Sequence, residues 1–209
     1  MYRFSKRLLD IIISLTATIF LLPVFLFILV SIKLSDKGPA IFKQTRAGNN
    51  AKPFTLYKFR TMKTGGDPFG ASPKNQTDPR LTKIGTFLRE YSLDELPQLF
   101  NVLKGQMSIV GPRPLYVSQI EEWDDNQKRR LLVKPGLTGL AQTSGRGNLT
   151  IEAKLKLDVD YVDSAGFFLD LKIIFKTISC VFSKSSIYEK KYSEKQQTRN
   201  SKNPEPPHP

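Results

Sequence analysis

Apolar positions are most concentrated near the start of the chain, where residues 11–32 contain no charged side chain. The exceptions to apolar character in this segment are Ser14, Thr16, Thr18, Pro23 and Ser31. As one helix the segment would extend about 33 Å, at roughly 1.5 Å per residue, which is enough to cross the hydrocarbon core of a bilayer. Its apolar side chains would cover every face of that helix, so we predict that it lies in lipid.

Three interpretations of this apolar segment differ in topology. A cleaved signal peptide would explain the basic start at Arg3, Lys6 and Arg7, but the segment is too long and no small-x-small cleavage site follows it. Length alone favours a simple spanning helix. Two features favour a re-entrant hairpin instead: basic residues flank both ends, so the positive-inside rule defines no outside face, and Pro23 interrupts the helical hydrogen bonds at mid-segment.

Strand patterns follow the membrane segment. Residues 41–46 and 54–61 read as two strands joined by Gly48-Asn49-Asn50, which predicts a small β-hairpin. The hairpin is heavily basic and includes Lys58 and Arg60, so it is either a solvated face near anionic headgroups or a phosphate-binding rim. Residues 63–80 are rich in glycine and proline and lack an apolar period, which predicts a loop.

Helical patterns dominate the rest of the chain. Helices are predicted over residues 82–90, 92–104 and 151–162, the second of them closed by Gly105. Residues 170–182 carry an amphipathic pattern that either packs on the core or lies in the membrane interface, and the apolar stripe consists of Leu171, Ile174, Phe175, Ile178 and Phe182. The fold class is therefore α+β and mainly helical, with interfacial amphipathic helices.

Composition narrows the chemistry that such a fold can perform. The 209 residues suit one domain, and 32 Lys and Arg against 19 Asp and Glu give a net charge of +13, which implies anionic partners. The single cysteine, Cys180, excludes an intramolecular disulfide, and the single histidine, His208, lies next to the end of the chain. If the protein is an enzyme, carboxylates, lysines and arginines must carry the reaction.

An adjacent acidic pair, Asp94 and Glu95, is the strongest candidate for chemistry. The conservative interpretation is a capping box, because Ser92 and Glu95 have the spacing that starts a helix. Pro97 would then lie too deep in the first turns, so we expect something to displace the helix start. A carboxylate at a helix N-terminus is expected to have a low pKa, which would leave Asp94 ionised as a nucleophile or a magnesium ligand.

Two arginines are candidate phosphate clamps. Arg113 lies between Pro112 and Pro114, which restrict the backbone and lower the entropic cost of holding its guanidinium in place. Arg146 lies in a glycine-rich stretch, although an isolated arginine of this kind, like Arg60, is more often a solvated surface residue. Residues 134–142, which end at Gln142, have the glycine content of a loop that approaches a ligand closely.

Ordered motifs from Arg3 to about Phe182 are shared with one known family. They are Gln44-x-Arg46-x-Gly48, Tyr57-Lys58-Phe59-Arg60-Thr61-Met62, Asp78-x-Arg80, Leu93-Asp94-Glu95-Leu96-Pro97-Gln98, Asn101-Val102, Met107-Ser108, Gly111-Pro112-Arg113-Pro114, Lys134-Pro135-Gly136-x-Thr138-Gly139, Gly145-Arg146 and residues 158–162. On these residues the chain resembles the bacterial sugar transferase family, the monotopic phosphoglycosyl transferases that move a phosphosugar from a UDP-sugar onto polyprenol phosphate.

The resemblance implies specific roles for site residues. Asp94 resembles the nucleophile that attacks the β-phosphate of the UDP-sugar, forms an aspartyl-phosphosugar and releases UMP. Glu95 resembles its dyad partner, and the two carboxylates would hold Mg²⁺. The remaining candidates are grouped by role: phosphate or substrate binding for Arg113, Arg146, Lys58, Arg60, Arg80 and Gln142, and structural support for Pro23, Asp158 and Asp170.

The resemblance also implies an organisation and a cellular place. Residues 1–36 would form a re-entrant membrane helix broken at Pro23, residues 37–183 a catalytic domain on the cytoplasmic face of the bacterial inner membrane, and residues 184–209 a disordered polar tail. Partners would be a UDP-sugar and undecaprenyl phosphate, without nucleic acid, in the first membrane step of glycoconjugate assembly. The length suggests a minimal family member, and the choice between monomer and homodimer stays open. Departures from the family pattern are Leu22, Thr86 and Gln106.

Two rival functions stay open on the residues alone. A membrane-anchored basic module that binds anionic lipid or nucleic acid is compatible with the charge of +13, but it would not require the acidic pair. A carboxylate-based glycoside hydrolase is disfavoured, because adjacent residues at a helix start rarely flank a sugar at the required separation of roughly 5 Å or more.

Overall fold

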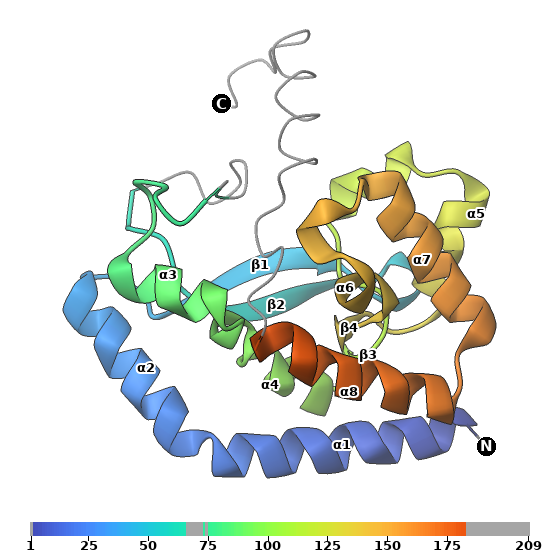
Figure 1. Ribbon diagram of the computed structural model, residues 1–209, viewed down its shortest axis with the longest axis horizontal. Helices are drawn as coiled ribbons and strands as arrows, with labels where there is room; N and C mark the ends of the chain where they lie inside the picture. Colours follow the sequence, from blue (N-terminus) through green and yellow to red (C-terminus); the bar gives the residue numbers. More distant parts are fainter. Residues whose placement is uncertain (1, 66–72, 74, 183–209) are drawn as a thin grey trace, which may run out of the picture.

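The computed structural model describes residues 2–65, 73 and 75–182 and has a mixed helical and sheet architecture (Figure 1). The tail predicted at residues 184–209 and the central part of the loop predicted at 63–80 lie outside the described residues. The elements, in chain order, are α1 (Tyr2–Phe20), α2 (Leu22–Ser35), β1 (Ile41–Ala47), β2 (Pro53–Phe59), α3 (Lys83–Glu90), α4 (Gln98–Leu103), β3 (Ser108–Val110), α5 (Asp125–Lys128), β4 (Gly136–Thr138), α6 (Leu140–Ser144), α7 (Ile151–Ser164) and α8 (Phe167–Phe182).

The apolar segment forms two helices rather than one. α1 and α2 meet at Leu21 with a bend of 61°, and Pro23 occupies the first turn of α2, where its missing N–H removes no hydrogen bond. The predicted break is therefore confirmed. Among the described helices, none alone is long and apolar enough to cross a bilayer, whereas this bent pair has the length and composition to do so.

The described strands form two small two-stranded sheets. β1 and β2 pair antiparallel, with Gln44 opposite Leu56 and Arg46 opposite Phe54, so the predicted hairpin is confirmed. β3 and β4 pair parallel, with Ser108 beside Gly136 and Val110 beside Thr138. The second sheet therefore joins the segment after α4 to residues 134–142, which were predicted to form a loop.

The helix predicted over residues 92–104 is shorter than expected. α4 begins only at Gln98, and Leu93–Glu95 form a separate 3-10 turn. Ser92 has a left-handed backbone (φ 56°), and its side chain makes no capping hydrogen bond, so the capping-box interpretation is wrong. Pro97 explains the displacement, because it cannot donate a helical hydrogen bond and is tolerated only at a helix start. Gly105 follows the helix with φ 77°, as its predicted role at the end requires.

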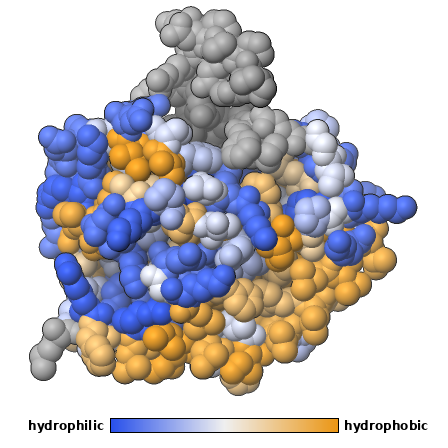
Figure 2. Space-filling model, turned by 180° about the vertical axis from the view of Figure 1, so that it is seen from behind, coloured by the Kyte–Doolittle hydropathy of each residue, from blue (hydrophilic) through white to orange (hydrophobic). Residues whose placement is uncertain are grey.

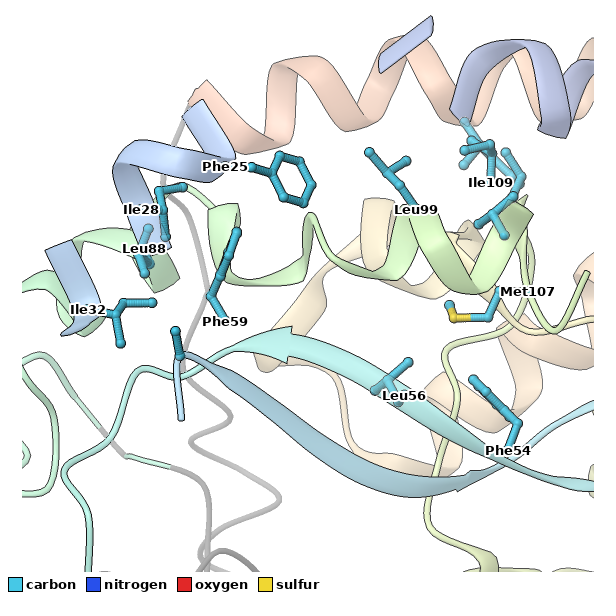
Figure 3. Close-up of a cluster of buried hydrophobic side chains, with 14 of the residues drawn as sticks. Phe25, Ile28, Ile32, Phe54, Leu56, Phe59, Leu88, Leu99, Met107 and Ile109 are labelled. Carbon is cyan, nitrogen blue, oxygen red and sulfur yellow. The ribbon is translucent and has the colours of Figure 1, made fainter. Parts of the chain in front are cut away.

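One hydrophobic core joins α2 to the elements around the acidic pair (Figure 3). Phe25, Ile28 and Ile32 are buried along one side of α2 and point toward Phe59 of β2 and Leu88 of α3. The rings of Phe25 and Phe59 meet edge to face with centroids 5.4 Å apart. α2 is therefore part of the folded body and not a separate anchor that projects away from it.

Polar contacts fix α1 to the same body. The Arg7 guanidinium donates to the carbonyl oxygens of Val102 (2.6 Å) and Leu103 (2.9 Å), which satisfies carbonyls at the C-terminal end of α4. The buried Asp10 carboxylate accepts hydrogen bonds from the Ser108 hydroxyl (3.0 Å) and the Ile109 N–H (2.8 Å) in β3. α1 is thereby tied to both the helix after the acidic pair and the strand before Arg113.

An additional cluster around Asp170 holds the start of α1 against α8. The Asp170 carboxylate accepts hydrogen bonds from Tyr2 (2.8 Å), Lys6 (2.6 Å) and the buried Tyr161 hydroxyl (2.8 Å). Asp36, just after α2, meanwhile accepts from the N–H of Thr64 (2.7 Å). Both ends of the bent helix pair are thus bonded to one body.

Most of the exposed large apolar side chains lie on α1, α2 and α8. Figure 2 shows apolar residues along the lower edge of the molecule, where α1 lies in Figure 1. On α8, Leu171, Phe175 and Ile178 of the predicted stripe are exposed, whereas Ile174 packs against the core. The side of α8 that packs inward includes the buried Asp170 and Ile173. The most exposed apolar residues on these helices are Phe4, Ile19, Phe20, Phe27, Leu34, Phe168 and Phe175.

Candidate active site

The acidic pair lies on the 3-10 turn between α3 and α4. The left-handed backbone at Ser92 reverses the chain after α3, and Pro97 ends the turn and starts α4. Because the turn is held between two helices, Asp94 is drawn inward and is only 8% exposed. Ser92 thus adopts an unfavourable backbone conformation, and the turn that follows directs the Asp94 carboxylate into the protein.

Glu95 is clamped between two cations. Lys58 Nζ of β2 lies 2.9 Å from Glu95 Oε1, and Arg113 Nη2 lies 2.7 Å from the same oxygen. Arg113 Nη1 also donates to Oε2 at 3.3 Å, which makes the contact bidentate. The predicted site residues Lys58, Glu95 and Arg113 are therefore brought together from three separate parts of the sequence.

The Asp94 carboxylate is surrounded by charge but is not clamped. Among the described residues, no group donates a hydrogen bond to it and none forms an ion pair with it. Its charge is nevertheless influenced by Lys58, Arg89 and Arg113. A buried carboxylate without donors is under-solvated, and such an oxygen is available to an electrophile or a metal ion.

The two carboxyl groups have opposite pKa shifts. Burial raises the pKa of Asp94, and the adjacent Glu95 charge adds to the rise against the pull of Lys58, Arg89 and Arg113. Burial would also raise the pKa of Glu95, but Arg113 and Lys58 outweigh it and hold that pKa well below its usual range. The low pKa predicted for Asp94 is therefore wrong: the residue lies on a short buried turn, where desolvation outweighs any helix-dipole effect.

Arg113 is presented by a rigid backbone. The Pro112 carbonyl accepts a hydrogen bond from the Gly136 N–H (2.8 Å), and the Arg113 carbonyl accepts one from Arg130 Nη2 (2.6 Å). Arg130 is itself buried in an ion pair with Asp158, with Nη2 2.7 Å from Oδ2. These bonds fix the carbonyls on both sides of the Arg113 Cα, so the guanidinium is held by the second sheet and by a buried pair.

Two glycines of residues 134–147, Gly136 and Gly139, serve this support. The predicted loop is not continuous, because these residues include β4, α6 and a 3-10 turn (Arg146–Asn148). A Cβ added to Gly136 would lie 2.1 Å from the Gly111 nitrogen, and one added to Gly139 would lie 2.1 Å from the Gly111 oxygen. Glycine is therefore required because the two backbones touch next to Pro112.

A small pocket opens beside the clamp. It is lined by Arg46, Leu56, Lys58, Gln98, Arg113 and Pro114. Two of its cations, Lys58 and Arg113, are the partners of Glu95. Basic side chains at the edge of a pocket next to two carboxylates suit a phosphate-bearing ligand that those carboxylates must approach.

The other predicted substrate-binding residues lie in different surroundings. Arg60 is buried at the end of α2, where Nη2 donates to the Asp36 carbonyl (2.7 Å) and lies 3.7 Å from the Asp36 carboxylate. Arg80 pairs with Asp78, two residues earlier, with Nη2 2.7 Å from Oδ2. Both arginines therefore have local acidic partners of their own.

Gln142 lies in α6, and Arg146 lies in the 3-10 turn that follows it. Both polar atoms of the Gln142 side chain are buried and have no hydrogen-bond partner among the described residues. Arg146 has a left-handed backbone (φ 49°) directly after Gly145. Neither side chain has a hydrogen bond or ion pair with the acidic pair in the described part of the chain.

Three important residues escaped the sequence analysis. Arg89 lies in the last turn of α3 and acts on the charge of Asp94, but a single arginine on a short amphipathic helix resembles a solvated residue. Arg130 follows two other basic residues and gives no sign of burial. Asp10 did offer a signal, because it is the only acidic residue among the first 35 and borders the apolar segment.

The donor set is compatible with magnesium. No group of three or more His, Cys, Asp or Glu residues that could hold a metal ion exists in the described part of the chain, so an all-protein cage is not available there. Mg²⁺ is commonly held by one or two carboxylates together with substrate phosphates. Asp94 and Glu95 can supply the carboxylates. Asp94 is the better ligand in this arrangement, because Glu95 is already occupied by Lys58 and Arg113.

Comparisons with known proteins agree with the motifs. The sequence profile described as bacterial sugar transferase matches residues 1–184. The uncharacterized sugar transferase EpsL of Bacillus subtilis is 47% identical over 188 residues, which cover 88% of this chain and 90% of EpsL.

Two relatives with a named reaction are longer. The UDP-glucose:undecaprenyl-phosphate glucose-1-phosphate transferase of Escherichia coli is 41% identical over 194 residues, which cover 89% of this chain and 42% of that protein. The undecaprenyl-phosphate galactose phosphotransferase of Salmonella typhimurium is 38% identical over 201 residues, which cover 89% of this chain and 42% of that protein. The chain thus spans less than half the length of these two relatives.

Proposed function

The chain belongs to the bacterial sugar transferase family, and from this membership we propose that it is a phosphoglycosyl transferase that moves a phosphosugar from a UDP-sugar to undecaprenyl phosphate. The names of the relatives support the reaction class and leave the sugar undefined. The observation that carries the proposal is the contrast at the acidic pair: Glu95 is clamped by two cations, while Asp94 is buried without a donor. Asp94 is therefore the candidate nucleophile, and Glu95 is the residue that holds the phosphate-binding cations Lys58 and Arg113.

In the first step, an oxygen of the Asp94 carboxylate attacks the β-phosphorus of the UDP-sugar. A bond forms between that oxygen and phosphorus, and the bond from phosphorus to the bridging oxygen breaks. UMP leaves with the electron pair, and the phosphosugar stays on Asp94 as an acyl phosphate. Lys58 and Arg113 lower the repulsion between a carboxylate and a diphosphate, because both cations lie next to the pair.

In the second step, a phosphate oxygen of the polyprenol phosphate attacks the same phosphorus. The bond between phosphorus and Asp94 breaks, and the carboxylate is restored with the electron pair of that bond. The product is a polyprenol diphosphate sugar. Two displacements at one phosphorus predict ping-pong kinetics, in which UMP is released before the lipid reacts.

We further propose that Mg²⁺ takes part, with Asp94 and Glu95 as its protein ligands. A bound Mg²⁺ would neutralise part of the charge on the diphosphate and polarise its phosphorus–oxygen bonds. Lys58 and Arg113 would keep their role of orienting the phosphate and holding Glu95.

The proposed place of action is the cytoplasmic face of the bacterial inner membrane. The exposed apolar side chains of α1, α2 and α8 suit burial in lipid, and α8 adds an interfacial helix whose Lys172 and Lys176 are exposed. Both ends of the bent pair are bonded to the body through Asp170 and Asp36, which supports a re-entrant hairpin. A site fixed to such a hairpin can meet a lipid phosphate at headgroup depth.

Trapping the covalent intermediate tests this proposal. The full chain in detergent is incubated with Mg²⁺ and a panel of UDP-sugars, without lipid acceptor, and is analysed by intact-protein mass spectrometry and by UMP release. One sugar of the panel is expected to add a phosphosugar to the protein and to release one UMP per chain. Asp94→Asn is expected to form no adduct and to lower the rate of UMP release by a factor on the order of a thousand or more.

Asp125→Asn provides the matched control, because it removes the same charge from a fully exposed position on α5. This variant is expected to form the adduct at the rate of the parent. An adduct on a residue other than Asp94, or UMP release that is equal in the parent and Asp94→Asn, would contradict the proposal.

A further inference from the structure

We infer that Arg46 is a phosphate-binding residue of the UDP-sugar site and contacts the phosphate that remains on uridine and leaves as UMP. The inference rests on the proposed function, because it divides the diphosphate between two ends of one pocket. It concerns the nucleotide end of the pocket, whereas the acidic pair concerns the end where the sugar phosphate reacts.

The register of the hairpin places Arg46 and Lys58 on one face. Phe42 lies opposite Lys58, Gln44 opposite Leu56, and Arg46 opposite Phe54. Because side chains alternate between the faces of a strand, Gln44, Arg46, Leu56 and Lys58 project to the same side. That side faces the residues after Pro112, since Arg46, Leu56 and Lys58 line one pocket together with Arg113 and Pro114.

The Arg46 side chain is held in one orientation by two neighbours. Its Nε and Nη2 both donate to Gln44 Oε1, at 3.0 and 2.6 Å, and its guanidinium carbon lies 3.6 Å above the centre of the Tyr116 ring. Gln44 in turn donates to the Tyr116 hydroxyl (3.2 Å). A planar cation fixed by a hydrogen-bonded amide and an aromatic face loses little entropy when it binds a ligand.

The pocket that Arg46 lines has the charge of an anion site. Arg46, Lys58 and Arg113 reach it from β1, β2 and the segment after β3, and none of the described residues that line it is acidic. Glu95 neutralises part of the charge of Lys58 and Arg113. By charge, a diphosphate in contact with these cations is the ligand class that suits this lining.

The order of the cations along the pocket assigns the two phosphates. Lys58 and Arg113 contact Glu95, so they lie at the end where Asp94 attacks. The Arg46 pair lies four residues further along the hairpin than the Lys58 pair, roughly 13 Å along the strands between Cα positions before the side chains converge. The attacked β-phosphate must be near the dyad, so the α-phosphate is the one left for Arg46.

Binding of UMP to the full chain in detergent, measured by calorimetry without Mg²⁺ or sugar, tests the inference. Arg46→Met is expected to weaken UMP binding by about tenfold or more, as for the loss of one charge-assisted hydrogen bond. Arg46→Lys, which keeps the charge but not the planar fork, is expected to lose several-fold. Lys43→Met is the matched control, since Lys43 is exposed on the opposite face of the same strand. It is expected to bind UMP as the parent does.

Each outcome decides the inference. The inference is overturned if Arg46→Met binds UMP as tightly as the Lys43→Met control. If Arg46→Met does not fold, the same comparison is made with Arg46→Lys. If Arg46→Met keeps UMP affinity but slows only the transfer from preformed adduct to polyprenol phosphate, the phosphate belongs to the lipid and the inference is also overturned. Because UMP binding needs no Asp94 chemistry, an Arg46-dependent affinity without any adduct would uphold the inference and refute the proposed reaction.

Discussion

Asp94 and Glu95 are adjacent in sequence but depend on opposite electrostatic effects. Desolvation dominates at Asp94 and favours its neutral form, while Arg113 and Lys58 stabilise the charged form of Glu95. A carboxylate that is costly to ionise is a stronger base and nucleophile than an ordinary aspartate once it is ionised. The desolvation penalty thus falls on Asp94, the residue proposed to react, and the compensating contacts are made by its neighbour Glu95.

Removing the two charges separately is expected to change stability in opposite directions. The raised pKa of Asp94 means that its contribution to stability is complete below its unfolded pKa and is lost as pH rises through the folded pKa. Asp94→Asn should therefore raise the melting temperature at pH 7, by about 2 to 4 °C for each kcal/mol gained in a chain of this size. The gain should disappear near pH 4.

Glu95→Gln is expected to have the reverse effect. The lowered pKa of Glu95 means that its stabilising contribution is present above its unfolded pKa and is lost only as pH falls through the folded pKa. At pH 7 the substitution should lower the melting temperature by a few degrees, because Lys58 and Arg113 lose their common partner. Differential scanning fluorimetry in detergent at pH 7 and pH 4 measures both variants. The same sign of shift in both would contradict this account of the pair.

At the scale of elements, the structure follows the sequence-based predictions where a local rule dominates. Pro23 cannot donate the hydrogen bond that would continue α1 into α2, Pro97 displaces the start of α4 to Gln98 as expected, and the alternation in residues 41–46 and 54–61 determines the hairpin. The structure departs from the predictions where the outcome depends on contacts between distant segments. The glycines near Gly136 are required by backbone contact with Gly111. A single sequence contains no record of that contact.

The Arg130–Asp158 pair is the same kind of feature, because it joins α7 to the segment before β4. Its two side chains are 2% and 3% exposed, and Arg130 also holds the Arg113 carbonyl. Asp158→Ala leaves a buried arginine without its acid, so we expect a loss of about 3 to 5 kcal/mol of stability. Asp163→Ala is the control five residues later on α7, where the partner Arg129 is exposed, and it should cost about 1 kcal/mol or less. Denaturant unfolding of both variants compares the losses, and equal losses would contradict the proposed support of Arg113.

At the scale of the whole molecule, the contacts of α1 and α2 support the proposed re-entrant topology. Arg7, Asp10 and Asp170 bond the start of α1 to the body, and Asp36 bonds the end of α2 to it. A straight spanning helix would place these two ends on opposite sides of a bilayer about 30 Å thick, and the contacts at one end would be lost. A hairpin that enters and leaves the same leaflet keeps every contact and buries the exposed apolar side chains of both helices.

Cysteine labelling in intact bacteria tests this topology. Arg3→Cys and Lys37→Cys, each in a Cys180→Ser background, place thiols at exposed positions beside the two ends of the helix pair. Both are expected to resist a membrane-impermeant maleimide in intact cells and to react after permeabilisation, because the proposed hairpin keeps both ends on the cytoplasmic side. A third variant, Asp125→Cys on the exposed α5, reports the side of the body in the same assay. Reaction of either end thiol from outside, while Asp125→Cys stays protected, would show that the helix pair crosses the membrane.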